Sequence, residues 1–148
     1  LLFDTGYALS PAGPYGAQWM TAALDMKTGA KRWQANYQEG SYNIPYGIAV
    51  ARDGSTVYVT GTSHPAFGPV AGSPAGFATT VAYDAESGSR RWISRVASGN
   101  AQTSDTGFAV TTAPGGAVFV AACFFMPVGG GTGANDPASW AIMRYEGR

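Results

Sequence analysis

Charge is scarce in this chain and the two signs balance. Of its 148 residues only 12% are charged, with nine basic and nine acidic side chains and a formal net charge of zero. Proteins that bind nucleic acid carry a basic patch, so no nucleic-acid partner is expected. No apolar run approaches the roughly 20 residues that a membrane helix needs, so no membrane insertion is expected either.

Cysteine and histidine each occur once. The single Cys123 excludes an intrachain disulfide, and its place in the apolar run 118–125 indicates a buried thiol. His64 precedes Pro65 and has no clustered Asp, Glu or Cys near it in the sequence, so it gives only weak support to a metal site or a general base. No catalytic residue, no metal site and no cofactor are therefore predicted.

Turn-forming residues and aromatic residues are abundant instead. Glycine occurs 21 times and proline nine times, and 13% of the residues are aromatic. This composition is typical of a folded protein with many turns and long loops. No helical periodicity of useful length is present, so the regular structure is expected to be β-strand.

One stretch of sequence is present twice, 59 residues apart. Residues 23–33 read Ala-Leu-Asp-Met-Lys-Thr-Gly-Ala-Lys-Arg-Trp, and residues 82–92 read Ala-Tyr-Asp-Ala-Glu-Ser-Gly-Ser-Arg-Arg-Trp. Each copy predicts a strand, a tight turn and a second strand that reaches Trp. The same position in each turn favours backbone capping by the Asp over paired catalytic carboxylates, and it favours packing by the Trp. The predicted structural motif is Asp25, Gly29, Trp33, Asp84, Gly88 and Trp92.

The repeat extends to four strands in each unit. Strands are predicted at residues 1–7, 18–25, 30–37, 46–50, 57–62, 77–84, 89–96, 106–110, 118–123 and 139–146. Tight turns join them into antiparallel sheets, and strands that are apolar on both faces indicate sheets covered on both sides. We predict an all-β fold, a partial β-propeller of about two and a half four-stranded blades, with a β-sandwich as the alternative. The chain is treated as one domain, 1–148, with repeat units at about 1–56, 57–117 and 118–148.

Closed propellers use roughly four to eight blades, so this chain is expected to be part of a larger ring. The two terminal blades would then expose apolar faces that neighbouring blades should cover, and such faces drive association. We therefore predict partners in the form of further blades or of self-association. The expected faces lie around Leu1, Leu2 and Phe3 at one end and around Trp140, Ile142 and Tyr145 at the other.

The repeat resembles the bacterial β-propeller repeats called SBBP repeats, whose units carry a sequence like residues 47–61. Its hairpin is similar to the tryptophan-docking motif of quinoprotein-type propellers, in which the Trp of one blade packs on the hairpin of the next. The matching residues are Ala23, Asp25, Thr28, Gly29 and Trp33, and then Ala82, Asp84, Gly88 and Trp92 with Ser87 in place of Thr. The glycine that this family has soon after Trp comes late, at Gly40 and Gly99, and nothing matches its quinone-binding or calcium-binding residues. The resemblance thus implies a fold and no redox chemistry.

Three long loops, at 8–17, 63–76 and 124–138, are expected on one face of the sheets. Aromatic loops on a rigid scaffold suit recognition, so we predict a non-catalytic scaffold or recognition module that binds a protein or a carbohydrate. A fragment of a quinoprotein-like oxidoreductase or of a propeller-fold hydrolase is the alternative. An extracellular or cell-surface location is expected. The predicted binding residues are Tyr15, Tyr42, His64, Phe67, Phe124 and Phe125.

Overall fold

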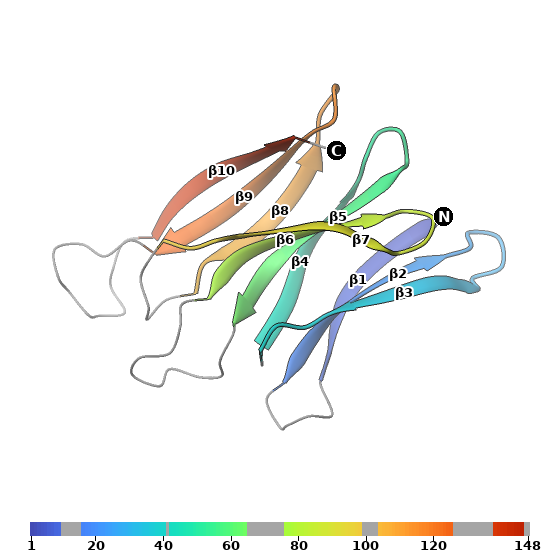
Figure 1. The fold of residues 1–148 in the computed structure, drawn as a ribbon, viewed down its shortest axis with the longest axis horizontal. Helices are drawn as coiled ribbons and strands as arrows, with labels where there is room; N and C mark the ends of the chain where they lie inside the picture. The colour runs from blue at the N-terminus through green and yellow to red at the C-terminus, as the bar shows by residue number, and fades with distance from the viewer. Residues whose placement is uncertain (10–15, 41, 65–75, 99–103, 126–137, 147–148) are drawn as a thin grey trace, which may run out of the picture.

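The structure, a computed structural model, describes residues 1–9, 16–40, 42–64, 76–98, 104–125 and 138–146. Ten strands lie in this part of the chain (Figure 1). They are β1 (Leu2–Leu9), β2 (Ala17–Leu24), β3 (Lys31–Tyr37), β4 (Tyr42–Val50), β5 (Thr56–His64), β6 (Phe77–Asp84), β7 (Arg90–Val96), β8 (Thr106–Thr112), β9 (Ala117–Phe125) and β10 (Ala138–Glu146).

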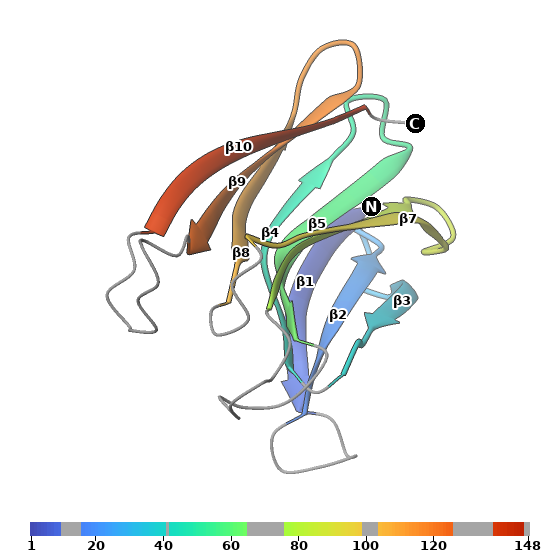
Figure 2. The same cartoon turned by 60° about the vertical axis from the view of Figure 1, so that its left-hand side comes forward.

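The strands form three antiparallel groups: β1–β3, β4–β7 and β8–β10. Within a group each strand pairs with the next one along the chain. The first two groups share one sheet through a single parallel pair, Ala17 with Tyr42, and a similar parallel bridge joins Gly76 to Ser104 before β8. Figures 1 and 2 show the β4–β7 group lying between the other two. Neighbouring groups therefore pack face to face, since β4 contacts β1, β2 and β8.

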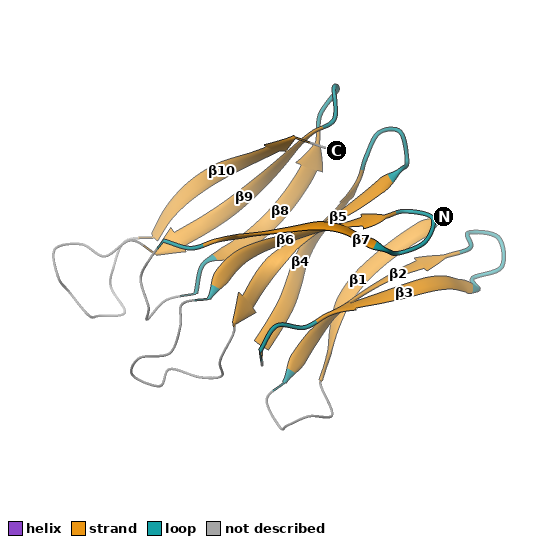
Figure 3. Ribbon diagram, viewed as in Figure 1, coloured by secondary structure: helices purple, strands orange, loops and turns teal. Residues whose placement is uncertain are grey.

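Every described element in Figure 3 is a strand, a turn or a loop, which confirms the predicted all-β class. None of the described residues forms a helix long and apolar enough to cross a membrane. The predicted unit 57–117 begins near β5, whereas the second group begins one strand earlier, at β4. The boundaries of the sequence units and of the structural groups are therefore offset by one strand.

Strand β4 differs from its prediction. It begins at Tyr42 rather than at Tyr46, and so includes residues 42–45, which lie outside the strand predicted at 46–50. Pro45 lies inside it, next to a β-bulge where the pairing with β5 shifts between Pro45 and Gly47. A bulge is one of the few places in a strand that tolerates proline, which has no N–H to donate. Because proline is rare inside strands, Pro45 argues against a strand over residues 42–45 when the sequence is considered alone.

The repeated Asp residues organise two matching turns. Asp25 Oδ1 accepts hydrogen bonds from the backbone N–H of Lys27 (2.9 Å) and of Thr28 (3.1 Å), and its Oδ2 lies 2.7 Å from Arg32 Nη2. The Arg32 contact has the largest effect, and together with the two backbone hydrogen bonds it holds the pKa of the Asp25 carboxyl well below its usual range. The second turn repeats the pattern with Asp84, Glu86, Ser87 and Arg91. Both carboxylates are therefore engaged within their own hairpins.

Trp33 joins the first group to the second. Its indole Nε1 donates a 3.0 Å hydrogen bond to the carbonyl oxygen of Ala85, in the hairpin of the next group. The ring also covers Gly88, where a Cβ atom would come within 2.7 Å of it. Trp92 occupies the matching position in the second group, with its ring centroid 5.5 Å from that of Tyr145 in the third. The two tryptophans thus lie at two successive junctions of the same kind.

The core lies between the groups, and strands β5 and β6 of the middle group are buried on both faces. At the first junction two aromatic residues of β2 and β3 meet strands β5 and β6, and at the second β5 and β6 meet β9. The buried residues of the first cluster are Trp19, Tyr37, Val57, Val59, Val81, Tyr83 and Ala85. Those of the second are Tyr58, Ala82 and Val118.

Two residues predicted on uncovered end faces point inward instead. Phe3 is half-buried and its ring lies 5.9 Å from that of Trp33, and Tyr145 is half-buried against Trp92. Successive side chains of a strand point to opposite faces, so Leu2 and Phe3 cannot share one face. Leu2 and Ile142 do remain exposed, at 54% and 68%.

Candidate functional site

The predicted binding aromatics that lie in the described part of the chain do not form one loop cluster. Tyr15 and Phe67 lie outside the described residues. Phe124 and Phe125 belong to strand β9 and not to the loop that was expected to begin at Phe124. Tyr42 opens strand β4, so it too comes from a strand.

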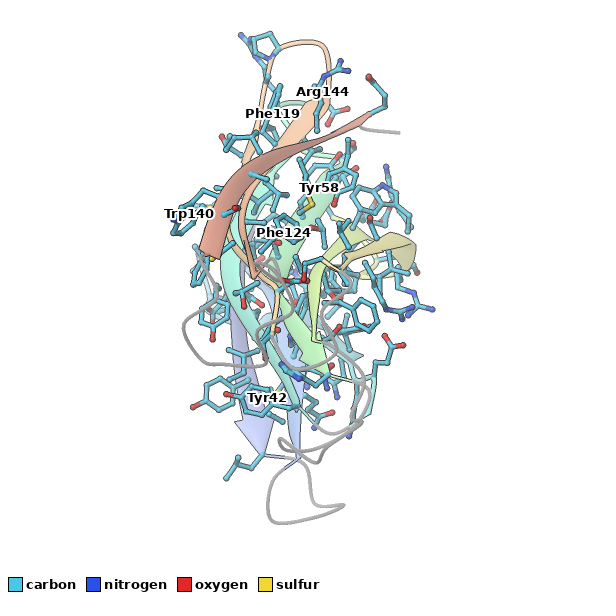
Figure 4. All side chains as sticks on the ribbon, turned by 90° about the vertical axis from the view of Figure 1, so that its left-hand side faces the viewer. Tyr42, Tyr58, Phe119, Phe124, Trp140 and Arg144 are labelled. Atoms are coloured by element: carbon cyan, nitrogen blue, oxygen red, sulfur yellow. The ribbon has the colours of Figure 1, made fainter. Side chains whose placement is uncertain are left out.

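Phe124 is a core residue, which corrects its predicted role. Its side chain is 6% exposed and packs with Ala78 and Ala122 between the second and third groups. Figure 4 shows it between the ribbons. It belongs to the apolar run that also contains Cys123, whose predicted burial is confirmed. Burial also raises the pKa of the Cys123 thiol, so this sulfur is packed rather than reactive.

Tyr42 and His64 do meet, at the paired ends of β4 and β5. Their ring centroids are 5.5 Å apart in an edge-to-face arrangement. The imidazole lies directly over Gly76, where a Cβ would come 2.5 Å from it. Burial lowers the pKa of His64, so the ring is neutral at pH 7. These contacts make His64 a packing residue that supports Tyr42.

A row of exposed aromatic rings continues from Tyr42 across the three groups. The Tyr46 and Phe108 rings lie 5.5 Å apart, and the Phe108 and Trp140 rings are also 5.5 Å apart. Figure 4 shows Trp140 at the margin of the molecule, on strand β10. Burial, with the nearby phenols of Tyr42 and Tyr7, raises the pKa of Tyr46 and keeps its hydroxyl protonated. We call these five residues the aromatic row: Tyr7, Tyr42, Tyr46, Phe108 and Trp140.

Two β-bulges place the centre of the aromatic row. Tyr46 is the extra residue where the β4–β5 pairing shifts between Pro45 and Gly47. Phe108 is the extra residue where the β8–β9 pairing shifts between Gly107 and Ala109. A bulge re-aims a side chain that would otherwise alternate with its neighbours. Both rings are therefore exposed, Tyr46 by 50% and Phe108 by 43%, although they lie on the first strands of packed groups.

Glycines let the two bulged strands approach each other. A Cβ at Gly47 would lie 3.1 Å from the carbonyl oxygen of Phe108, and a Cβ at Gly107 would lie 2.1 Å from Thr60 Oγ1. Larger residues at these positions would force β8 away from β4 and β5. The close packing of backbones brings Tyr46 and Phe108 into contact.

The predicted strands 46–50 and 106–110 place Gly47 and Gly107 at the same position, so Tyr46 and Phe108 do not stand out as equivalent residues in the sequence. The strand pairing shows a different match, in which Pro45 and Gly107 hold equivalent positions, opposite Gly61 and Ala122. The aromatic residue then follows immediately in both strands. A search for an aromatic residue next to the glycine of each strand would have found both, because Tyr46 precedes Gly47 and Phe108 follows Gly107.

A cavity of about 330 Å³ lies at the other end of β4 and β8, between the turns that lead into β5 and β9. Asp53 Oδ1 accepts hydrogen bonds from the backbone N–H and the hydroxyl of Ser55, at 2.9 and 2.8 Å. Thr56 Oγ1 accepts a 2.8 Å hydrogen bond from Arg91 Nη1. These side chains already form hydrogen bonds within the protein, so fewer of their polar atoms are available to bind a ligand in this cavity. The aromatic row is therefore the stronger candidate site.

The described residues contain no group of three His, Cys, Asp or Glu side chains that could hold a metal ion. The side chains of the aromatic row are all uncharged. No protein-family model and no curated protein matches this chain.

Proposed function

We propose that the three antiparallel groups are blades of a β-propeller-type scaffold. Two successive junctions of like construction support this arrangement, each with a tryptophan (Trp33 or Trp92) on the following group. The parallel bridges at Ala17 and Gly76 also come at matching places, just before or at the start of β2 and β6. Repetition of one junction is what radial stacking of blades requires.

On this scaffold the protein acts as a non-catalytic recognition module through the aromatic row. The observation that carries the proposal is the pair of bulges that expose Tyr46 and Phe108 at equivalent positions of neighbouring groups. Exposing large rings from a packed strand forgoes their burial, and aromatic residues are enriched in the cores of recognition surfaces. Rings that are fixed by a sheet also lose little conformational entropy when a ligand binds.

The ring geometry favours a protein surface over a carbohydrate as the ligand. The planes of Tyr46 and Phe108 are inclined by 41°, and those of Phe108 and Trp140 by 44°. Inclined rings in contact form one uneven apolar patch, which suits the side chains of a protein partner. A sugar ring that stacks flat would be served better by separate, parallel rings.

The proposal is tested with arrays of surface proteins and of glycans. The variant that carries Tyr46→Ser and Phe108→Ser should lose binding by about thirtyfold or more, because truncation of a hot-spot ring costs ~2 kcal/mol or more. Met26→Ser is the matched control, since Met26 is also an exposed apolar residue but lies in the turn after β2, away from the row. Silence of the wild type on both arrays, or equal binding by the double variant, would count against recognition by this row.

A further inference from the structure

The cavity between the turns that lead into β5 and β9 contains polar groups that make no contact within the protein. Its volume of about 330 Å³ is at the lower end of the range for pockets that hold small molecules. None of the residues that line it belongs to the aromatic row. A ligand in this cavity would therefore be separate from the one in the proposed function.

Tyr58 lines the cavity, and the rest of its side chain lies in the core, so that it is only 2% exposed. Within the described part of the chain no group forms a hydrogen bond with its hydroxyl. The hydroxyl is also not enclosed in the core, unlike that of Tyr83, which is buried there without a partner. It therefore opens on the cavity, where it can donate or accept a hydrogen bond.

Two opposite charges lie next to each other in the turn after β4. Arg52 and Asp53 are both exposed and both line the cavity, and neither forms an ion pair with any described residue. The backbone N–H and the hydroxyl of Ser55 both donate to Asp53 Oδ1, which leaves Oδ2 available. The same contacts, the backbone N–H first, hold the pKa of Asp53 below its usual range, so the carboxylate is charged at pH 7.

Between these charges and Tyr58 the lining consists of small uncharged residues, among them Ala51 and Ala113. The hydroxyl of Thr112 donates a 3.1 Å hydrogen bond to the carbonyl oxygen of Val50 and so has its own partner. A lining of this kind can contact an apolar group without leaving many polar atoms unpaired. The cavity thus combines one positive charge, one negative charge, a hydroxyl and an apolar surface.

We propose that this cavity binds a free α-amino acid with an apolar side chain. The guanidinium of Arg52 suits the carboxylate of such a ligand, and the carboxylate of Asp53 suits its ammonium group. A free α-amino acid carries these two charges on one carbon atom, much as the turn carries its own on adjacent residues. The end of a peptide has only one of the two charges and would leave Arg52 or Asp53 unpaired.

Three forms of one ligand test both charge contacts by equilibrium dialysis. L-leucine should bind, whereas N-acetyl-leucine lacks the ammonium group, leucinamide lacks the carboxylate, and each should bind about tenfold more weakly. Arg52→Gln should weaken leucine binding by about the same factor and remove the preference for leucine over leucinamide. Asp53→Asn should instead remove the preference for leucine over N-acetyl-leucine, and its amide oxygen can still accept hydrogen bonds from Ser55.

Two further variants show where the ligand lies. Tyr58→Phe removes only the hydroxyl and should weaken leucine binding about fivefold. Lys27→Gln is the matched control, because it removes an exposed charge from the turn after β2, which does not line the cavity. This control should bind leucine like the wild type. Circular dichroism of each variant verifies that it is folded.

No uptake of leucine by the wild type at concentrations up to about 10 mM overturns the inference, and so does equal binding of the three ligands. An unchanged affinity in Tyr58→Phe would also overturn it, because the ligand would then lie on the exposed turn and not in the cavity. This inference does not rest on the proposed function. The variants leave the aromatic row unaltered, so the arrays with Tyr46→Ser and Phe108→Ser decide that function separately.

Discussion

Gly29 and Gly88 allow the tryptophan contact to be measured by itself, because they occupy the same place in two copies of one turn. Both have left-handed backbones, with φ of +71° and +74°. A Cβ at Gly88 would stand 2.7 Å from the ring of Trp33, whereas a Cβ at Gly29 would meet no heavy atom within 4 Å. We predict that Gly88→Ala destabilises the fold more than Gly29→Ala.

The magnitude follows from two separate costs. Alanine in a left-handed conformation costs roughly 1–2 kcal/mol, and this cost is common to both variants. Only Gly88→Ala overpacks a junction, which typically costs about 1–3 kcal/mol. Displacement of the Trp33 ring would also weaken its 3.0 Å hydrogen bond to Ala85. The difference between the two variants in free energy of unfolding is therefore expected to be about 2 kcal/mol.

Urea unfolding gives the free energies directly, and a second comparison identifies their cause. In a Trp33→Leu background the smaller side chain leaves room above residue 88, so the excess cost of Gly88→Ala should shrink. The cost of Gly29→Ala should not change, because Gly29 has no such contact. Equal losses for the two glycine variants, or an excess that survives Trp33→Leu, would refute the docking argument.

Two further predictions concern the strand ends and the bulged strands. Burial lowers the pKa of His64 below its ordinary 6.5, so the unfolded chain binds the proton more readily; stability should fall as the pH drops below about 6.5, and His64→Gln should remove that dependence in urea titrations at several pH values. Gly107→Ala should lower the free energy of unfolding by about 1–3 kcal/mol because its Cβ meets Thr60 Oγ1, and Thr60→Ala should restore part of the loss. Gly6→Ala, in open space, is the control for the second experiment.

The strands and turns could be predicted because their signals are local. The Asp and Gly of each hairpin determine a turn by hydrogen bonds and backbone angles within a few residues, as at Asp25 and Gly29. Alternation and β-branched residues then indicate the flanking strands. The direction of a side chain such as Phe3 is less local, because it depends on which face the neighbouring group covers. The sequence repeat could not supply that for the first and last groups.

Prediction of the aromatic row requires the pairing registers of β4 with β5 and of β8 with β9. The glycine pattern in the sequence indicates the wrong correspondence between β4 and β8. Gly47 and Gly107 look equivalent, but Gly47 makes room for the backbone of β8 whereas Gly107 makes room for Thr60. Each glycine is required by a close contact with a different neighbouring strand. Alignment of the two glycines therefore does not indicate where the bulge lies. Tyr46 and Phe108 are equivalent only through their unpaired positions opposite β5 and β9. The sheet itself does not require any particular residue type at an unpaired bulge position. The presence of an exposed aromatic residue at this position in both groups is therefore better explained by binding of a ligand to these rings than by stabilisation of the sheet.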